Sequence, residues 1–168
     1  PVLIDCNEDT WNINENKIEE KITDRTKAII VVHIYGHPCE MDKIMNIAKK
    51  HNLIVIEDVA EAHGAEYKGK KCGSIGDIGC FSFYANKILT TGEGGMAITN
   101  NLDYAEKMRK FRNYAFQNPR FLHHDLGANY RLTNLQAAIG VAQTENVDML
   151  VEARRNVGLR YNKLLNNI

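Results

Sequence analysis

Two kinds of hydrophobic pattern alternate along the first third of the chain. Residues 28–34 read AIIVVHI and residues 53–56 read LIVI, and both runs are almost unbroken in their apolar character. Such runs are typical of strands that are buried on both faces of a parallel sheet. Between them, four apolar residues recur at helical spacing: Met41, Ile44, Met45 and Ala48. A strand, a helix and a second strand in about 30 residues predict a βαβ unit.

The remainder of the chain continues as short strands and helices. Residues 80–84 and 95–99 are expected to form strands, and a helix is expected from Asn100 or Asn101 to about Tyr114. Thr133 and Gln136 have the spacing of a capping box that opens another helix. A last helix is expected from about Val147. The pattern predicts an α/β fold with three layers, in which helices flank a mostly parallel sheet.

The 168 residues have the length of about one domain. We expect residues 1–146 to form the central part of a large domain, and residues 147–168 to form a long helix leading toward a small C-terminal domain. The chain opens with Val2, Leu3 and Ile4, which are expected to form a strand. A chain that begins inside such an element is expected to be part of a longer protein.

Charge and composition exclude several classes of partner. Lys plus Arg number 21 and Asp plus Glu number 21, so bulk electrostatics do not favour a nucleic acid partner. No apolar stretch reaches the length of a membrane span, and we expect no membrane partner. The four cysteines lack metal-knuckle or redox spacing, which is typical of free thiols in a reducing cytoplasm. They are Cys6, Cys39, Cys72 and Cys80.

Acidic residues follow the second apolar run, where ligands of parallel sheets commonly bind. Asp58 has two interpretations: it caps the next helix, or its carboxylate holds a buried cationic ring nitrogen and raises the pKa of that nitrogen. Glu61, three residues on, shares a face with Asp58 if the segment begins a helix. Its other interpretation is a solvated acid in the first turn of that helix.

Lys87 and Ser82 belong to the next strand end. Most lysines are solvated, but five apolar residues surround Lys87, and partial desolvation makes a lysine amine a Schiff-base nucleophile. These residues are Phe81, Phe83, Tyr84, Ile88 and Leu89. The Ser82 hydroxyl either donates to a phosphate or is simply a polar group on the pleat. The glycines of residues 92–95 indicate a tight bend or a close approach of the backbone.

Two histidine pairs do not predict a metal site. His33 and His37 are four residues apart, but Gly36 and Pro38 break any helix that could bring them together. The segment 123–125, HHD, is expected to be a solvated loop.

Taken together, three segments resemble one family. IEDVAEAHGA, GDIGCFSFYANKILTTGEGGM and GANYRLTNLQAAIG resemble the nucleotide-sugar aminotransferases, a branch of the fold-type I enzymes that depend on pyridoxal 5'-phosphate. The resemblance covers essentially the whole chain. It implies that Lys87 is the catalytic residue and binds the cofactor as a Schiff base, that Asp58 pairs with the pyridine nitrogen, and that Ser82 binds the phosphate. It further implies that Glu61 contacts the cofactor and that Asn129 reaches the phosphate of the neighbouring subunit's cofactor.

The resemblance also implies substrates and partners. Glu61 stands where many members have Gln or His, and this resembles the perosamine synthases, which aminate GDP-4-keto-6-deoxymannose to GDP-perosamine, a deoxyamino sugar of lipopolysaccharide O-antigens. The amino donor is expected to be L-glutamate. A homodimer with shared active sites is expected.

Three alternatives remain at this point. A sugar 3-dehydratase branch of the same family carries His where the Schiff-base lysine stands, so Lys87 disfavours dehydration. A catalytically silent scaffold or partner domain that kept the fold is a second alternative. A dinucleotide-binding dehydrogenase is weakened because no G-x-G-x-x-G follows a first strand.

Overall fold

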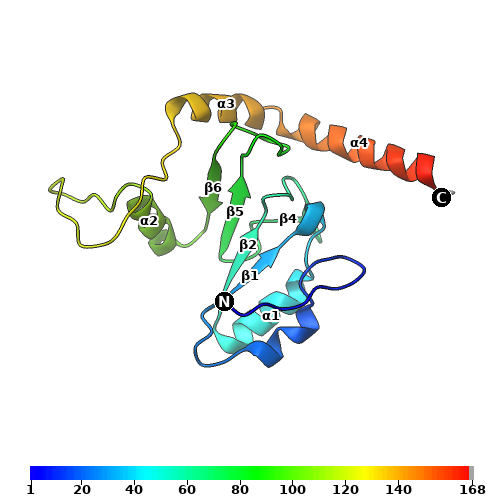
Figure 1. Cartoon of the computed structure of the whole chain (residues 1–168), viewed down its shortest axis with the longest axis horizontal. Coiled ribbons are helices and arrows are strands. Elements are labelled where there is room, and N and C mark those ends of the chain that lie inside the picture. The colour runs from blue at the N-terminus through cyan, green and yellow to red at the C-terminus, as the bar shows by residue number, and fades with distance from the viewer. Residues whose placement is uncertain (167–168) are drawn as a thin grey trace.

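The computed structural model describes residues 1–166, and its centre is a four-stranded sheet in the order β1-β2-β5-β6 (Figure 1). The first three strands run parallel, whereas β6 is antiparallel to β5. The strands are β1 (Ala28–Val32), β2 (Ile54–Asp58), β5 (Ile78–Ser82) and β6 (Gly95–Ile98). All four were expected from the sequence, and the mostly parallel α/β sheet is confirmed.

One face of the sheet is covered by α1 (Met41–His51), which connects β1 to β2. Its apolar stripe packs against inward-facing side chains of both strands, so the predicted βαβ unit is confirmed. Asn52 ends the helix in the left-handed conformation, and its N–H donates to the carbonyls of Ala48 and Lys49. Two short 3-10 helices (Glu15–Lys17 and Glu19–Lys21) and a hairpin of β3 (Glu66–Tyr67) and β4 (Lys70–Lys71) complete this layer.

The opposite face of β1 is open to solvent, contrary to the expectation that its residues are buried on both sides. The burial of β1 alternates along the strand, and Ile30 and Val32 are 62% and 37% exposed. The reason is that α1 packs on one face only, and within residues 1–166 no helix is packed on Ile30. The apolar run therefore correctly predicted a strand but not its surroundings.

Three further helices follow β6 in the chain. They are α2 (Leu102–Phe111), α3 (Asn134–Thr144) and α4 (Val147–Leu165). The predicted capping box is present at α3, where Thr133 and Gln136 exchange hydrogen bonds. Helix α2 ends earlier than expected, because Tyr114 and Ala115 have positive φ and cannot continue it.

Helix α4 begins at the predicted residue and runs away from the sheet (Figure 1). Its first turns touch the chain after β2, since a Cβ at Gly64 would meet Val151. None of its residues is buried. Residues 167–168 of the predicted 147–168 helix lie outside the described residues. No helix in the described part of the chain has both the length and the apolarity to cross a membrane.

The predicted strand at Val2, Leu3 and Ile4 is wrong. Within residues 1–27 the only β pairing is an isolated bridge between Cys6 and Ile13. No strand within residues 1–166 pairs with Val2–Ile4. Three apolar residues are not enough to form a β-strand without a partner for their backbone hydrogen bonds.

Candidate active site at the carboxyl edge of the sheet

Successive residues of β2 send their carboxylates to opposite faces of the sheet. Glu57 lies on the α1 side and is fully buried, whereas Asp58 lies on the open side. Asp58 is in register with Val32 of β1 and with Cys80 of β5. Because side chains alternate along a strand, Ser82 shares the face of Cys80 and Asp58. The sheet therefore brings Asp58 and Ser82 to one face, at the carboxyl ends of adjacent strands.

Beneath them, the Glu57 carboxylate gathers four donors. Its Oε1 accepts from the N–H groups of Ile75 and Gly76 at 2.8 and 2.6 Å. Its Oε2 accepts from the N–H of Gly73 at 2.8 Å and from His33 Nε2 at 3.0 Å. Burial opposes ionisation of Glu57, but these hydrogen bonds outweigh burial and leave its pKa below the usual value.

This hydrogen-bond network connects the three chain segments that form the carboxyl edge of the sheet. His33 directly follows β1, Glu57 belongs to β2, and residues 73–76 lead into β5. The Nδ1 atom of His33 accepts from the N–H of Cys39 at 3.1 Å, so Nε2 is the nitrogen that carries the proton. The ends of β1, β2 and β5 are thus fixed relative to one another from the buried side.

His33, Glu57 and Cys72 form a compact buried group of atoms of the kind that bind metals. The hydrogen bonds just described already occupy both ring nitrogens and both carboxylate oxygens. Burial raises the pKa of the Cys72 thiol to about 11 and that of Cys39 to about 12, so both thiols are protonated at neutral pH. We interpret the group as a hydrogen-bonded network and not as a metal site.

Lys87 lies in the turn that follows β5, and its N–H donates to the carbonyl of Tyr84 at 3.0 Å. Its side chain is only 17% exposed, and its Nζ lies 4.0 Å from Oε1 of Glu61. The desolvation that the sequence indicated for this lysine is confirmed. The amine is held at the same edge of the sheet as Asp58 and Ser82, with a carboxylate beside it.

The segment after β2 is a succession of turns and not a helix, which corrects the expectation for Asp58 and Glu61. Asp58 Oδ1 accepts from the N–H of Ala60 at 3.0 Å and closes a turn, so Asp58 is not a helix cap. Glu61 reaches Lys87 because the chain turns back here, not because helical spacing brings it there. A glycine at position 64, with φ of +79°, continues this sequence of turns.

Ser82 and the glycine-rich residues 92–95 flank the segment that contains Lys87. The Ser82 hydroxyl oxygen accepts from the N–H of Tyr84 at 3.3 Å, which leaves its proton free for an acceptor. At Gly94, with φ of +151°, a Cβ would lie 2.5 Å from Thr91 Oγ1. The predicted close approach of the backbone is therefore present, and it connects β5 to β6. Gln136 of α3 donates to the carbonyl of Glu93 at 2.9 Å and holds this connection.

His63 is a functional candidate that the sequence interpretation missed. It is 6% exposed, neither ring nitrogen has a hydrogen-bond partner among the described residues, and its ring lies between Phe81 and Phe83 at centroid distances of 5.7 and 6.2 Å. Burial lowers the pKa of His63, and the charge of Lys87 contributes in the same direction. The ring is thus neutral under the lysine turn. His63 is the only histidine in the segment IEDVAEAHGA, and the pattern of residues around it did not predict that it is buried.

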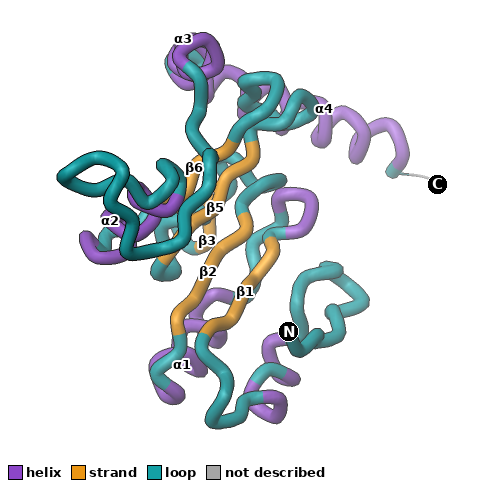
Figure 2. The backbone as a smooth tube through the Cα atoms, turned by 60° about the vertical axis from the view of Figure 1, so that its left-hand side comes forward, coloured by secondary structure: helices purple, strands orange, loops and turns teal. Residues whose placement is uncertain are grey.

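Asn129 is not brought to this edge. It is exposed and forms an isolated bridge with Asn113, in the segment beside α2 that lies across the sheet from β1 (Figure 2). The expectation that Asn129 serves a neighbouring subunit stays a prediction.

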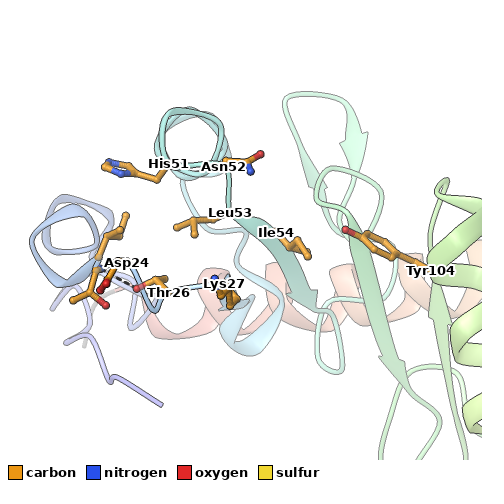
Figure 3. Close-up of a pocket in the computed structure, with 10 residues that line it drawn as sticks. Asp24, Thr26, Lys27, His51, Asn52, Leu53, Ile54 and Tyr104 are labelled. Atoms are coloured by element: carbon orange, nitrogen blue, oxygen red, sulfur yellow. Dashed lines mark hydrogen bonds between the residues drawn. The ribbon is translucent and has the colours of Figure 1, made fainter. Parts of the chain in front are cut away.

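A hollow of about 740 Å³ lies at the other end of the sheet. Figure 3 shows that His51 and Asn52 at the end of α1, the chain around Lys27, and Tyr104 of α2 line it. Lys27 directly precedes β1, so this hollow is at the amino ends of the parallel strands. It is separate from the edge that holds Asp58 and Lys87.

The fold and the edge just described are those of an aminotransferase family. The model of the DegT/DnrJ/EryC1/StrS aminotransferase family matches residues 1–168, and the chain belongs to that family. Two curated relatives are GDP-perosamine synthases. The enzyme from Caulobacter vibrioides is 54% identical over 94% of this chain and 43% of its own length. The enzyme from Escherichia coli O157:H7 is 46% identical over 100% of this chain and 46% of its own length.

Solved structures agree with the family assignment. Helicobacter pylori PseC, an aminotransferase involved in the biosynthesis of pseudoaminic acid, superimposes with a TM-score of 0.93 at 32% identity, covering 99% of this chain and 46% of that one. The expected fold-type I architecture is confirmed. The chain spans just under half the length of the relatives it matches.

Proposed function

We propose that the whole protein is a pyridoxal 5'-phosphate-dependent aminotransferase that acts on a nucleotide-linked keto sugar. The observation that carries the proposal is the shielded amine of Lys87, placed 4.0 Å from Glu61 at the carboxyl edge of the sheet. Family membership and the relatives named GDP-perosamine synthase support it. The finer proposal is that GDP-4-keto-6-deoxymannose is the acceptor, GDP-perosamine the product and L-glutamate the amino donor.

The chemistry of the available side chains fits the proposed cofactor. An amine suits an aldehyde, a carboxylate suits a protonated pyridine nitrogen, and a hydroxyl with a free proton suits a phosphate. Lys87, Asp58 and Ser82 supply these three groups, and Asp58 and Ser82 are on one face of the sheet. We propose that these residues, with Glu61 beside the lysine, hold the cofactor. When bound, pyridoxal phosphate supplies an electron-withdrawing ring that stabilises negative charge at the carbon that loses its proton.

The roles of the residues follow from their surroundings. Lys87 is the base that takes the proton from the α-carbon of the amino donor, since its amine is shielded from bulk water. Asp58 keeps the ring nitrogen protonated, because an adjacent carboxylate favours the charged form of that nitrogen. Glu61 holds the lysine amine at the edge when the lysine is free. The Ser82 hydroxyl anchors the phosphate.

We also propose that the enzyme is a homodimer in which Asn129 contributes to the partner's site. The exposed position of Asn129, which bridges to Asn113, supports this assignment. The family resemblance motivates it.

The residues 147–168 are proposed to lead toward a smaller C-terminal domain.

The proposal is tested on the whole enzyme by reduction with borohydride followed by peptide mass analysis. The cofactor should be found on the peptide that contains Lys87, and Lys87→Ala should lose both this adduct and turnover. Lys70→Ala, in the exposed β3–β4 hairpin, is the matched control and should keep both. An enzyme that retains turnover without Lys87 would refute the assignment.

Product masses test the substrate. Glutamate is incubated with GDP-4-keto-6-deoxymannose or with a dTDP-linked 4-keto sugar, and the product should have an amino group in place of the ketone oxygen with the GDP sugar. Loss of a ring hydroxyl without amination would instead indicate a dehydratase. No cofactor adduct and no product with any keto sugar would indicate a silent scaffold.

A further inference from the structure

The backbone at Tyr35 is strained. Tyr35 lies in the 3-10 turn after β1 (Ile34–Gly36) and has φ of 50° and ψ of 26°, the left-handed conformation that bulky residues rarely adopt. Holding such a residue there has an energetic cost, because its Cβ crowds the backbone. Strain of this kind persists only where surrounding contacts determine the conformation.

One of the contacts that hold this turn comes from Glu61. The N–H of Tyr35 donates to Glu61 Oε2 at 3.0 Å. The next residue, Gly36, has φ of +85°, and a Cβ there would lie 3.2 Å from the carbonyl oxygen of Glu61. The turn after β1 is therefore pressed against the turns after β2.

The same carboxylate also faces the lysine. Glu61 Oε1 lies 4.0 Å from Lys87 Nζ while Oε2 holds Tyr35. One carboxylate group thus separates the Tyr35 backbone from the amine that is proposed to carry the cofactor. The Tyr35 side chain is 87% exposed, so burial of its ring in this chain does not explain the strain.

We propose that Tyr35 is a substrate-positioning residue, whose ring packs against the sugar of the nucleotide-linked substrate and whose hydroxyl hydrogen-bonds to it. This inference rests on the proposed function and extends it to a residue outside the cofactor contacts. A 6-deoxy sugar presents carbon-rich surface beside hydroxyl groups, and a tyrosine ring offers both an apolar face and a polar tip. Glutamate is small and has no such surface, so only the sugar half of the reaction depends on Tyr35.

Two variants of the whole enzyme separate the ring from the backbone. Tyr35→Asn removes the ring with a residue that tolerates the left-handed conformation, so the fold and the Glu61 contact are retained. Tyr35→Phe keeps the ring and removes the hydroxyl. Tyr104→Asn is the control, because Tyr104 lines the hollow at the opposite end of the sheet.

The two half-reactions are measured separately. For Tyr35→Asn we expect conversion of glutamate to 2-oxoglutarate, in a single turnover, within about 2-fold of the unsubstituted enzyme, and a KM for the keto sugar raised roughly 10-fold or more. Calorimetric binding of the GDP-linked amino sugar should weaken by a similar factor. Tyr35→Phe should show a smaller rise of about 3-fold, and Tyr104→Asn no change.

Three results would overturn the inference. They are an unchanged sugar KM in Tyr35→Asn, an equal loss in both half-reactions, or weakened sugar binding in the Tyr104→Asn control. If the unsubstituted enzyme forms no 2-oxoglutarate from glutamate and aminates no keto sugar, the proposed function itself fails and this inference with it. A normal glutamate half-reaction with normal sugar binding in Tyr35→Asn leaves the proposed function standing and removes only the role of Tyr35.

Discussion

Glu57 and Asp58 are adjacent in β2, yet their carboxylates serve different parts of the molecule. Glu57 is fully buried among four hydrogen-bond donors, and Asp58 lies on the open face in register with Cys80 of β5. The first acid fixes the edge of the sheet, and the second is available to a ligand. Two neighbouring acids should therefore respond differently to the same loss of charge.

Glu57→Gln should destabilise the whole enzyme by on the order of 3 kcal/mol. Each carboxylate oxygen of Glu57 accepts two hydrogen bonds, and glutamine replaces one of these oxygens with an NH2 group that cannot accept. Two of the four hydrogen bonds are therefore lost. The urea midpoint of unfolding measures the effect. Glu106→Gln, on α2, is the control and should leave the midpoint unchanged. A midpoint for Glu57→Gln equal to that of the control would contradict the described role of the network.

Asp58→Asn should leave stability within about 1 kcal/mol and reduce turnover roughly 100-fold or more. The amide keeps the turn with Ala60 but no longer stabilises a proton on a ring nitrogen. Steady-state rates and bound-cofactor content are measured on the same sample. Asp103→Asn, in the first turn of α2, should keep its rate. Near-normal turnover in Asp58→Asn would remove Asp58 from its proposed role.

His63 should make the enzyme less stable in mild acid. In the folded protein the pKa of His63 is lowered from 6.5, mainly by burial. Below pH 6.5 this histidine therefore binds a proton in the unfolded chain but stays neutral in the folded chain, until the pH reaches the folded pKa. Stability should therefore fall as the pH drops from 6.5 to the folded value and then stay reduced. His63→Leu should flatten this part of the profile, whereas His124→Leu, at an exposed histidine, should not. Unfolding midpoints across the pH range measure it, and identical profiles for His63→Leu and the unsubstituted enzyme would count against a buried neutral ring.

Gly79→Ala should be among the most disruptive small changes in β5. A Cβ there would overlap the backbone carbonyl of Gly73, in the loop held by Glu57, and the expected cost is about 3 kcal/mol. Gly158→Ala is the matched control, since a Cβ at Gly158 of α4 meets nothing within 4 Å and should add up to about 1 kcal/mol of helix stability. Thermal midpoints should move in opposite directions, and a stable Gly79→Ala enzyme would show that this backbone approach is not tight.

The sequence predicted the elements better than their environment. Capping at Thr133 and helical spacing through Ile44 are local signals, and both were interpreted correctly. Exposure of Ile30 depends on what covers the sheet, which no local pattern records. A helix start after β2 was one of the two interpretations left open, because Asp58 and Glu61 also suit a helix N-terminus, and the structure has turns there instead.

The missed residues had weak signals. Glu57 follows Val55 at strand spacing, so alternation alone places it on the buried face and demands hydrogen-bond partners for it. That signal was available and unused. The contact between Tyr35 and Glu61 had none, because it depends on a positive φ at a tyrosine, which sequence pattern does not indicate.

The alternation in β2 also limits how this segment can evolve. Inserting or deleting one residue before Glu57 would exchange the faces of the two acids, so that the Glu57 carboxylate would lie on the open face and would no longer meet its four buried hydrogen-bond donors. Related chains can therefore vary in the side chains of this strand far more readily than in its length.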